Sequence, residues 1–214
     1  IQEANVRQYL NDPEARPKEE ARLEKAAAEV RPYGCLAYSL GDENGIIRTP
    51  KDMSPAELEA FRVFLARSYD GDLEALNRNW QTNYGDFSEA EAPLADPSKM
   101  PAPRRYDVDA FWDGAYADIN HWMAQALKRG DPDALVGAEG SWARDLEEVI
   151  SGLDWWAPYR DRNVNAMLRF WLPWSALRGN WWGTYPDDRL GPEHLWSQLA
   201  TGSVNASMFF ISPS

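Results

Sequence analysis

The chain has 214 residues, of which 34 are acidic and 22 basic, so its formal net charge is −12. This charge argues against nucleic-acid and anionic-membrane partners, because both require a surface rich in Lys and Arg. Eleven tryptophans, within an aromatic content of 13%, favour a pocket for flat ligands such as sugar rings, with roughly half of the indoles expected in the core. The acidity also favours a secreted or periplasmic protein over a cytoplasmic one.

Few residues are candidates for metal or redox chemistry. Cys35 is the single cysteine, so neither a disulfide framework nor a cysteine-based zinc site forms within the chain. His121 and His194 belong to no cluster of potential ligands and are interpreted as structural. We therefore expect no metal and no cofactor, and no apolar stretch reaches the roughly 20 residues of a membrane span.

Helical patterns dominate the first part of the chain. A run rich in Ala, Glu, Lys and Arg predicts a surface helix over residues 14–30, and an apolar strand follows over residues 34–40. Ser54 and Pro55 then predict a helix start, with Glu57 completing a capping box.

Two further helices are expected before the chain changes character. A short helix carries Leu76 and Trp80, and a proline-rich stretch predicts an irregular insertion around residues 81–106. A long helix closed by Gly130 follows. Its apolar face comprises Phe111, Ala115, Ile119, Trp122 and Ala126.

Short strands and helices alternate in the remainder. The predicted strands cover residues 134–138, 153–157, 180–184 and 207–211, and the predicted helices cover 144–150, 164–171 and 193–199. This alternation indicates parallel βαβ units and the α/β class. Five strands are too few for a closed barrel, so residues 1–214 are interpreted as one partial domain, the C-terminal five βα units of a (β/α)8 TIM-type barrel. The alternative is an open five-stranded sheet, whose edges would need covering.

Acidic, amide and aromatic side chains follow four of the predicted strands, where parallel barrels carry their functional residues. The candidates are Asp42, Glu43 and Asn44 after the first strand, Glu139 and Trp142 after the second, Tyr159 and Arg160 after the third, and Trp181, Trp182 and Tyr185 at the fourth. Their convergence predicts a carbohydrate site in which rings stack on the sugar, Asp42 or Asn44 bonds its hydroxyls and Arg160 recognises an anionic substituent or pairs with Asp154 or Asp161. Because neighbours in a strand point to opposite faces, at most about half of the paired tryptophans Trp155, Trp156, Trp181 and Trp182 are expected to face a ligand.

Glycoside hydrolysis requires two carboxyl groups. One is a protonated acid beside the leaving oxygen and the other an ionised nucleophile or base, about 5–5.5 Å away for retention and about 6.5–9.5 Å for inversion. Glu43, after an apolar strand and flanked by Tyr38 and Trp rings, is the candidate acid. Acidic residues at strand ends are also common for structural reasons alone.

A family resemblance supports that assignment. The stretch from Tyr38 to Asn44 resembles the fourth-strand segment of clan A glycoside hydrolases, in which an Asn–Glu pair ends the strand and the Glu is the acid/base. The residues that follow resemble glycoside hydrolase family 42, the β-galactosidase family. That similarity rests on Ser54, Phe61, Arg62, Leu65, Tyr69, Leu73, Leu76, Asn77, Trp80, Thr82, Tyr84 and Pro93. It implies a β-galactosidase-like barrel with Glu43 as acid/base.

Two positions depart from the family pattern. Asp42 stands where the family has the Asn that bonds the sugar's 2-hydroxyl, and the seventh-strand segment 180–185 lacks the family's nucleophile Glu. Glu139, Asp161 and Asp187 are possible substitutes, and Glu139 ranks first because it directly ends an apolar strand. A structural role for Glu139 is the alternative.

The resulting hypothesis is a glycosidase acting on β-galactosides or a galactose-containing polysaccharide. A non-catalytic glycan-binding barrel that has lost the nucleophile is the second hypothesis, and a structural fragment of a longer polypeptide is the third. The expected partners are a carbohydrate substrate and either the remainder of the polypeptide or further copies of the chain.

Overall fold

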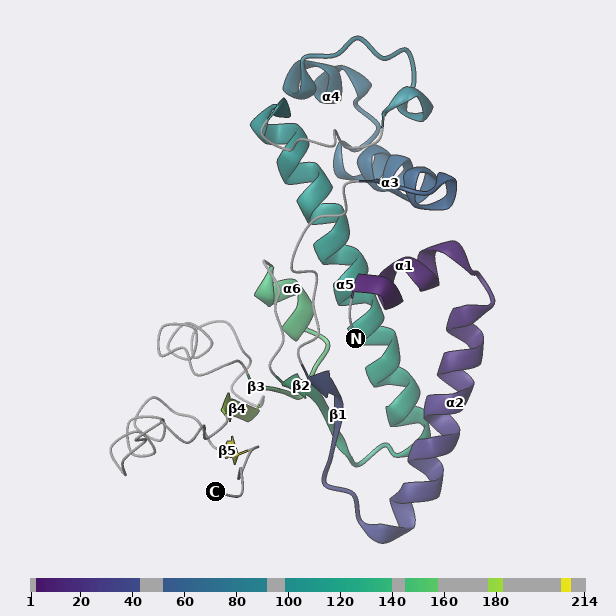
Figure 1. The fold of residues 1–214 in the computed structure, drawn as a ribbon, viewed down its shortest axis with the longest axis vertical. Coiled ribbons are helices and arrows are strands. Elements are labelled where there is room, and N and C mark those ends of the chain that lie inside the picture. The colour runs from purple at the N-terminus through teal and green to yellow at the C-terminus, as the bar shows by residue number, and fades with distance from the viewer. Residues whose placement is uncertain are drawn as a thin grey trace, which may run out of the picture.

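A computed structural model describes residues 3–42, 52–91, 99–139, 145–157, 177–182 and 205–208. In Figure 1, a layer of helices runs along one side of a small twisted sheet, and the longest helix extends well beyond it. Within the described ranges, no helix combines the length and apolar character needed to cross a bilayer.

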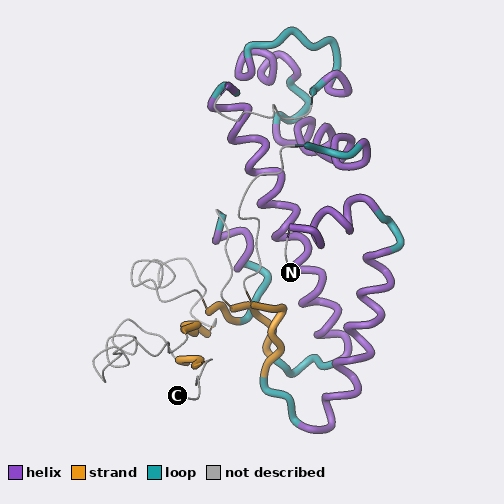
Figure 2. The backbone as a smooth tube through the Cα atoms, in the orientation of Figure 1, coloured by secondary structure: helices purple, strands orange, loops and turns teal. Residues whose placement is uncertain are grey.

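The sheet holds five parallel strands whose spatial order is their order along the chain. They are β1 (Ala37–Asp42), β2 (Leu135–Glu139), β3 (Trp155–Ala157), β4 (Leu177–Trp182) and β5 (Asn205–Met208), orange in Figure 2. The predicted parallel order is confirmed for these strands, and described helices lie between β1 and β2 and between β2 and β3. β1, β4 and β5 are displaced by two or three residues from the predicted ranges, and the predicted helices over 164–171 and 193–199 lie outside the described residues.

The first helices follow the sequence patterns closely. α1 (Glu3–Asn11) precedes α2 (Ala15–Val30), and the turn η1 (Arg31–Tyr33) ends the pair. α3 (Pro55–Ser68) begins with the expected capping box, in which Ser54 Oγ accepts the Glu57 amide and the Glu57 carboxylate accepts the Ser54 amide. α4 (Leu73–Trp80) and the turn η2 (Phe87–Glu89) complete this region.

The insertion predicted over residues 81–106 ends too late. α5 (Ala102–Gly130) has already begun there, with Pro103 in its first turn. A proline fits that position because the first helical amides have no intrahelical acceptor to lose. α6 (Leu146–Ile150) is the last described helix.

α5 forms the spine of the core. Phe111, Ile119 and Trp122 on its predicted apolar face are buried, and so is a second side that includes Trp112 and Tyr116. The extra burial arises because neighbours surround the helix: α2 packs along it, α3 and α4 lie at its N-terminal end, and α6, β1 and β2 cover another side. The periodicity of a single helix predicts one buried face, so it does not reveal that α5 is buried on more than one side.

Gly130 marks the closest approach of α2 and α5. A Cβ added there would lie 2.2 Å from the Glu24 carbonyl oxygen and 2.8 Å from the Ala27 Cβ. Gly130→Ala is therefore expected to push the two helices apart and to lower the unfolding free energy by about 1–3 kcal/mol, measured by urea denaturation. Gly85→Ala is the control, because its Cβ would meet only the movable Glu89 carboxylate, at 3.4 Å. Equal stabilities of the two variants would contradict this packing.

Candidate active site

The candidate site lies where β1 and β2 end side by side. Asp42 and Glu139 are paired positions in this parallel ladder, so their backbones are about 4.8 Å apart, the usual spacing of neighbouring strands. Glu43 follows Asp42 directly but lies outside the described residues. Asp42 and Glu139 thus end two adjacent strands at the carboxyl edge of the sheet.

A β-bulge immediately precedes this pair. Ser39 pairs with Gly137 and Asp42 with Glu139, so β1 advances three residues while β2 advances two. Gly41 has φ = 132°, a conformation that favours glycine, and its amide donates to Ser39 Oγ at 3.2 Å. Bulges reorient the residues that follow them and are common next to active sites. The sequence pattern predicts a regular strand here and does not reveal the bulge.

The two faces of the sheet are lined differently. Val136, Ala138 and Trp156 are fully buried in the core shared with the helices. The Trp155 indole lies against Gly137 from the opposite face, since a Cβ on Gly137 would come within 2.3 Å of Trp155 Cδ2. The expectation that adjacent tryptophans separate to opposite faces is confirmed for this pair.

The sequence left open which of the paired tryptophans lies on the side of a ligand, and Trp155 does so in this pair. It pairs with Gly137, two residues before Glu139, on the face turned away from the helices. Its side chain is partly exposed, and its indole Nε1 has no hydrogen-bond partner among the described residues. The glycine at the paired position is the signal that would have identified it, since glycine in a strand often marks close approach of another group.

Tyr38, which was expected beside the candidate acid, bonds to groups on the helix side of the sheet. Its hydroxyl lies 3.0 Å from Asp131 Oδ2 and 3.3 Å from the Ala27 carbonyl oxygen. Burial, together with the hydrogen bond to Asp131, raises the pKa of the Tyr38 hydroxyl well above its ordinary value. Tyr38 therefore belongs to the helix-facing side and ties β1 to α2 and to the end of α5.

Asp154 has partners other than the arginine suggested for it. It accepts hydrogen bonds from Lys128 Nζ at 2.8 Å and from the Val136 amide at 2.9 Å. These bonds connect α5, β2 and the start of β3, so Asp154 has a structural role. Arg160 itself lies outside the described residues.

The remaining predicted site residues divide into two groups. Trp181 and Trp182 occupy the end of β4, opposite Ser207 and Met208 of β5, and β4 carries no carboxylate along its length. The others lie outside the described residues; they are Asn44, Trp142, Tyr159 and Tyr185.

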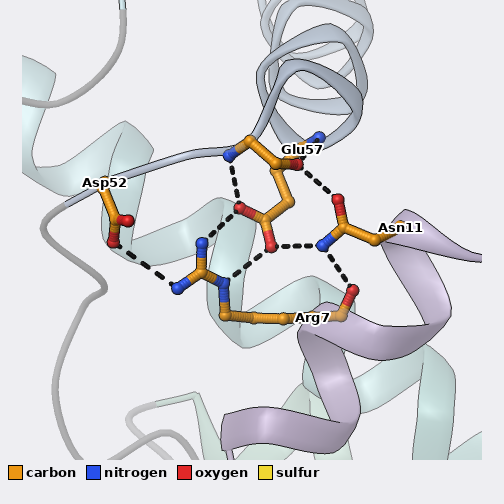
Figure 3. Close-up of polar contacts among 5 residues, drawn as sticks. Arg7, Asn11, Asp52 and Glu57 are labelled. Carbon is orange, nitrogen blue, oxygen red and sulfur yellow. Dashed lines mark hydrogen bonds and ion pairs between the residues drawn. The ribbon is translucent and has the colours of Figure 1, made fainter.

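A cluster of polar residues lies between α1 and the start of α3 (Figure 3). Arg7 of α1 binds Glu57 with two hydrogen bonds of 2.7 and 2.9 Å, and Asn11 donates to the same carboxylate at 2.8 Å. Burial disfavours the charged carboxylate, but the bonds from Arg7, the Ser54 amide and Asn11 outweigh it and hold the pKa of Glu57 below its ordinary value. This cluster joins α1 to the start of α3.

Among the described residues, no group of three or more His, Cys, Asp and Glu side chains is placed to hold a metal ion. The His121 ring lies between α5 and α6, with Nε2 3.1 Å from the Val149 carbonyl oxygen and its edge against Gly152. That position fits its structural interpretation.

Known proteins share both sequence and fold with this chain. Residues 32–172, about two thirds of the chain, match the glycoside hydrolase family 42 model, described as β-galactosidase. A β-galactosidase of Clostridium perfringens is 32% identical over 112 residues, which cover 48% of this chain and 16% of that protein.

Two solved β-galactosidases superimpose on most of the chain. The enzyme from Bacillus circulans sp. alkalophilus gives a TM-score of 0.72 at 19% identity, covering 94% of this chain and 34% of that one. A catalytic mutant of a family 42 β-galactosidase from G. stearothermophilus gives 0.70 at 17% identity, covering 94% and 35%.

These relatives are TIM-barrel proteins, and the chain spans about a third of the two solved structures. It therefore carries part of a TIM-type barrel rather than the independent open sheet considered as an alternative. The family match over most of its residues, together with this shared fold, shows that the chain belongs to the β-galactosidase family of glycoside hydrolases, family 42.

Proposed function

We propose that the chain supplies the acid/base part of the active site of a retaining β-galactoside hydrolase, with Glu43 as proton donor and Glu139 as nucleophile. The observation that carries this proposal is the pairing of Asp42 with Glu139 at the carboxyl ends of β1 and β2. In this proposal the chain contributes five βα units, and three more complete the barrel.

The spacing of neighbouring strands favours retention. Carboxyl groups that project from paired positions on adjacent strands are separated by roughly 5 Å, close to the about 5–5.5 Å of retaining enzymes. Inversion needs room for a water molecule between the two groups, about 6.5–9.5 Å. The absence of a carboxylate from β4 also leaves Glu139 as the acid best placed to assist Glu43.

The reaction then proceeds in two steps. Glu43 gives its proton to the glycosidic oxygen while a Glu139 carboxylate oxygen bonds the anomeric carbon, and the leaving group departs as an alcohol. Glu43, now ionised, takes a proton from water, whose oxygen attacks the anomeric carbon and releases Glu139.

Other residues position the sugar in this proposal. Asp42 or Asn44 accepts hydrogen bonds from its hydroxyls, and Arg160 recognises an anionic substituent where one is present. Aromatic rings stack on its apolar face; the candidates are Trp142, Tyr159, Trp181, Trp182 and Tyr185. The Trp155 indole, on the sheet face opposite the helices, is placed below the strand ends where the sugar would sit.

Azide distinguishes the two carboxylate roles. In Glu139→Ala, azide is expected to attack the anomeric carbon directly and to give the α-galactosyl azide, because only one inversion takes place. In Glu43→Ala, the covalent intermediate still forms from an activated aryl β-galactoside, and azide then gives the β-galactosyl azide. Proton NMR of the product reads the anomeric configuration.

Two outcomes would contradict the assignment. A Glu139→Ala variant with unchanged turnover would remove Glu139 from the mechanism. A β-galactosyl azide from that variant would place the nucleophile elsewhere while leaving Glu43 as acid/base.

A further inference from the structure

A pocket lies among the helices, beside the N-terminal turns of α5. Its volume is about 730 Å³, within the roughly 300–1,000 Å³ range of small-molecule sites. Its described lining residues lie in α3, at Tyr69 just after α3, in α4 and in the first turns of α5, and none of them lies in a strand.

A buried carboxylate forms part of the wall. Asp107 is 8% exposed, and its Oδ2 accepts hydrogen bonds of 2.7 Å from both the Tyr69 hydroxyl and the Trp80 indole. Burial raises the pKa of the Asp107 carboxyl above its ordinary value, although the bonds from Trp80 and Tyr69 act in the opposite direction. Among the described residues, no donor bonds the second carboxylate oxygen, Oδ1, of this lining residue.

Aromatic and amide groups complete the lining. Tyr106 is 72% exposed and stands at the pocket beside Phe64 and Tyr69. Asn79, which is exposed, also lines the pocket and donates to the Tyr69 hydroxyl at 3.3 Å. Among the described lining residues there is no Lys, Arg or His.

This combination selects among ligand classes. Without a cation, the pocket has nothing to neutralise a phosphate or carboxylate ligand. A purely apolar ligand would leave the buried Asp107 acceptor unsatisfied, which costs about 1–3 kcal/mol. A sugar ring satisfies both requirements, because its hydroxyls donate to carboxylate and amide oxygens while its C–H face rests on tyrosine rings.

We propose that this pocket binds one sugar residue of a galactose-containing saccharide, at a site separate from the hydrolytic one. The saccharide class follows from the lining, and the choice of galactose rests on the proposed function. Such a site holds a neighbouring part of a long substrate, or a second chain of it, on the surface of the enzyme.

The test is a titration of the intact protein with methyl β-D-galactopyranoside, followed through the indole N–H resonance of Trp80. This proton bonds Asp107, so occupancy of the pocket is expected to shift it in a saturable manner. Tyr106→Ala and Asp107→Asn should each raise the dissociation constant at this site at least about tenfold. Hydrolysis of an aryl β-galactoside should stay within about twofold of the unchanged protein in Tyr106→Ala.

Tyr33→Ala is the matched control, because Tyr33 is 87% exposed and does not line the pocket. The proposal is overturned if the sugar leaves the Trp80 resonance unmoved, or if tetramethylammonium rather than the sugar saturates the site. Dissociation of an oligomer by Tyr106→Ala would also overturn it, since a second copy would then cover the pocket. Each of these results leaves the role of Glu43 untouched, whereas hydrolysis retained by Glu43→Gln would remove that role without affecting this titration.

Discussion

Glu43→Gln is expected to lower kcat/KM for an unactivated β-galactoside by about 10²–10⁴-fold, the usual contribution of a positioned general acid. Glutamine keeps the size and polarity of the side chain but has no proton of suitable acidity for the leaving oxygen. Binding of the sugar should therefore persist, which equilibrium titration with a non-hydrolysed galactoside would measure.

The dependence on the leaving group makes this expectation specific. An acidic phenol leaves an aryl galactoside as a phenolate and needs little protonation. The rate of the first step with such a substrate should therefore fall much less in Glu43→Gln than the rate with an alkyl galactoside. Glu74→Gln is the control, since the Glu74 side chain is 90% exposed on α4. Equal loss with both kinds of substrate, or no loss with either, would exclude Glu43 as the acid.

Glu57→Ala is expected to cost about 3–5 kcal/mol of unfolding free energy, as removal of one member of a buried ion pair does. The Glu57 side chain is 0% exposed, and its loss leaves the Arg7 guanidinium without its main partner. The capping box of α3 is lost with it. Chemical denaturation of the intact protein measures the change.

Glu59→Ala, two residues along the same helix, is the matched control. Its side chain is 69% exposed and lies 3.9 Å from Arg62, so a change within about 0.5 kcal/mol is expected. A similar cost for both variants would show that the cluster of Figure 3 contributes little.

The same cluster predicts a dependence on pH. The pKa of Glu57 lies below its ordinary value of 4.5 in the folded state, so its stabilisation is fully present above that value. It is lost as the pH falls through the folded-state pKa, because protonation then abolishes the ion pair. Unfolding free energies measured from about pH 6 down to about pH 3 should fall more steeply for the unchanged protein than for Glu57→Ala.

Sequence patterns predicted the features that depend only on residues close together in the chain. The capping box at Ser54 and Glu57 involves residues three positions apart, so its spacing alone predicts the start of α3. The end of α5 at Gly130 and the opposite burial of Trp155 and Trp156 also follow from helical and strand periodicity. That Asp42 and Glu139 lie at the same edge of the sheet followed from one further rule, that parallel strands present their carboxyl ends at one edge.

Contacts between residues far apart in the sequence determined features that the local patterns did not predict. Arg7 meets Glu57 across 50 residues of sequence, and Tyr38 meets Asp131 across 93, so no local spacing reports either contact. The bulge at Gly41 depends on how β1 aligns with β2, which a single strand does not encode.

By itself, the sequence determined the parallel α/β class, the family and the acids at the strand ends, because strand alternation and motif spacing are local properties of the chain. Only the tertiary structure decided that Tyr38 faces the helices, that Trp155 covers Gly137 and that Asp107 lies in a pocket between three helices. The physical reason is that the direction and burial of a side chain depend on which distant elements pack against it.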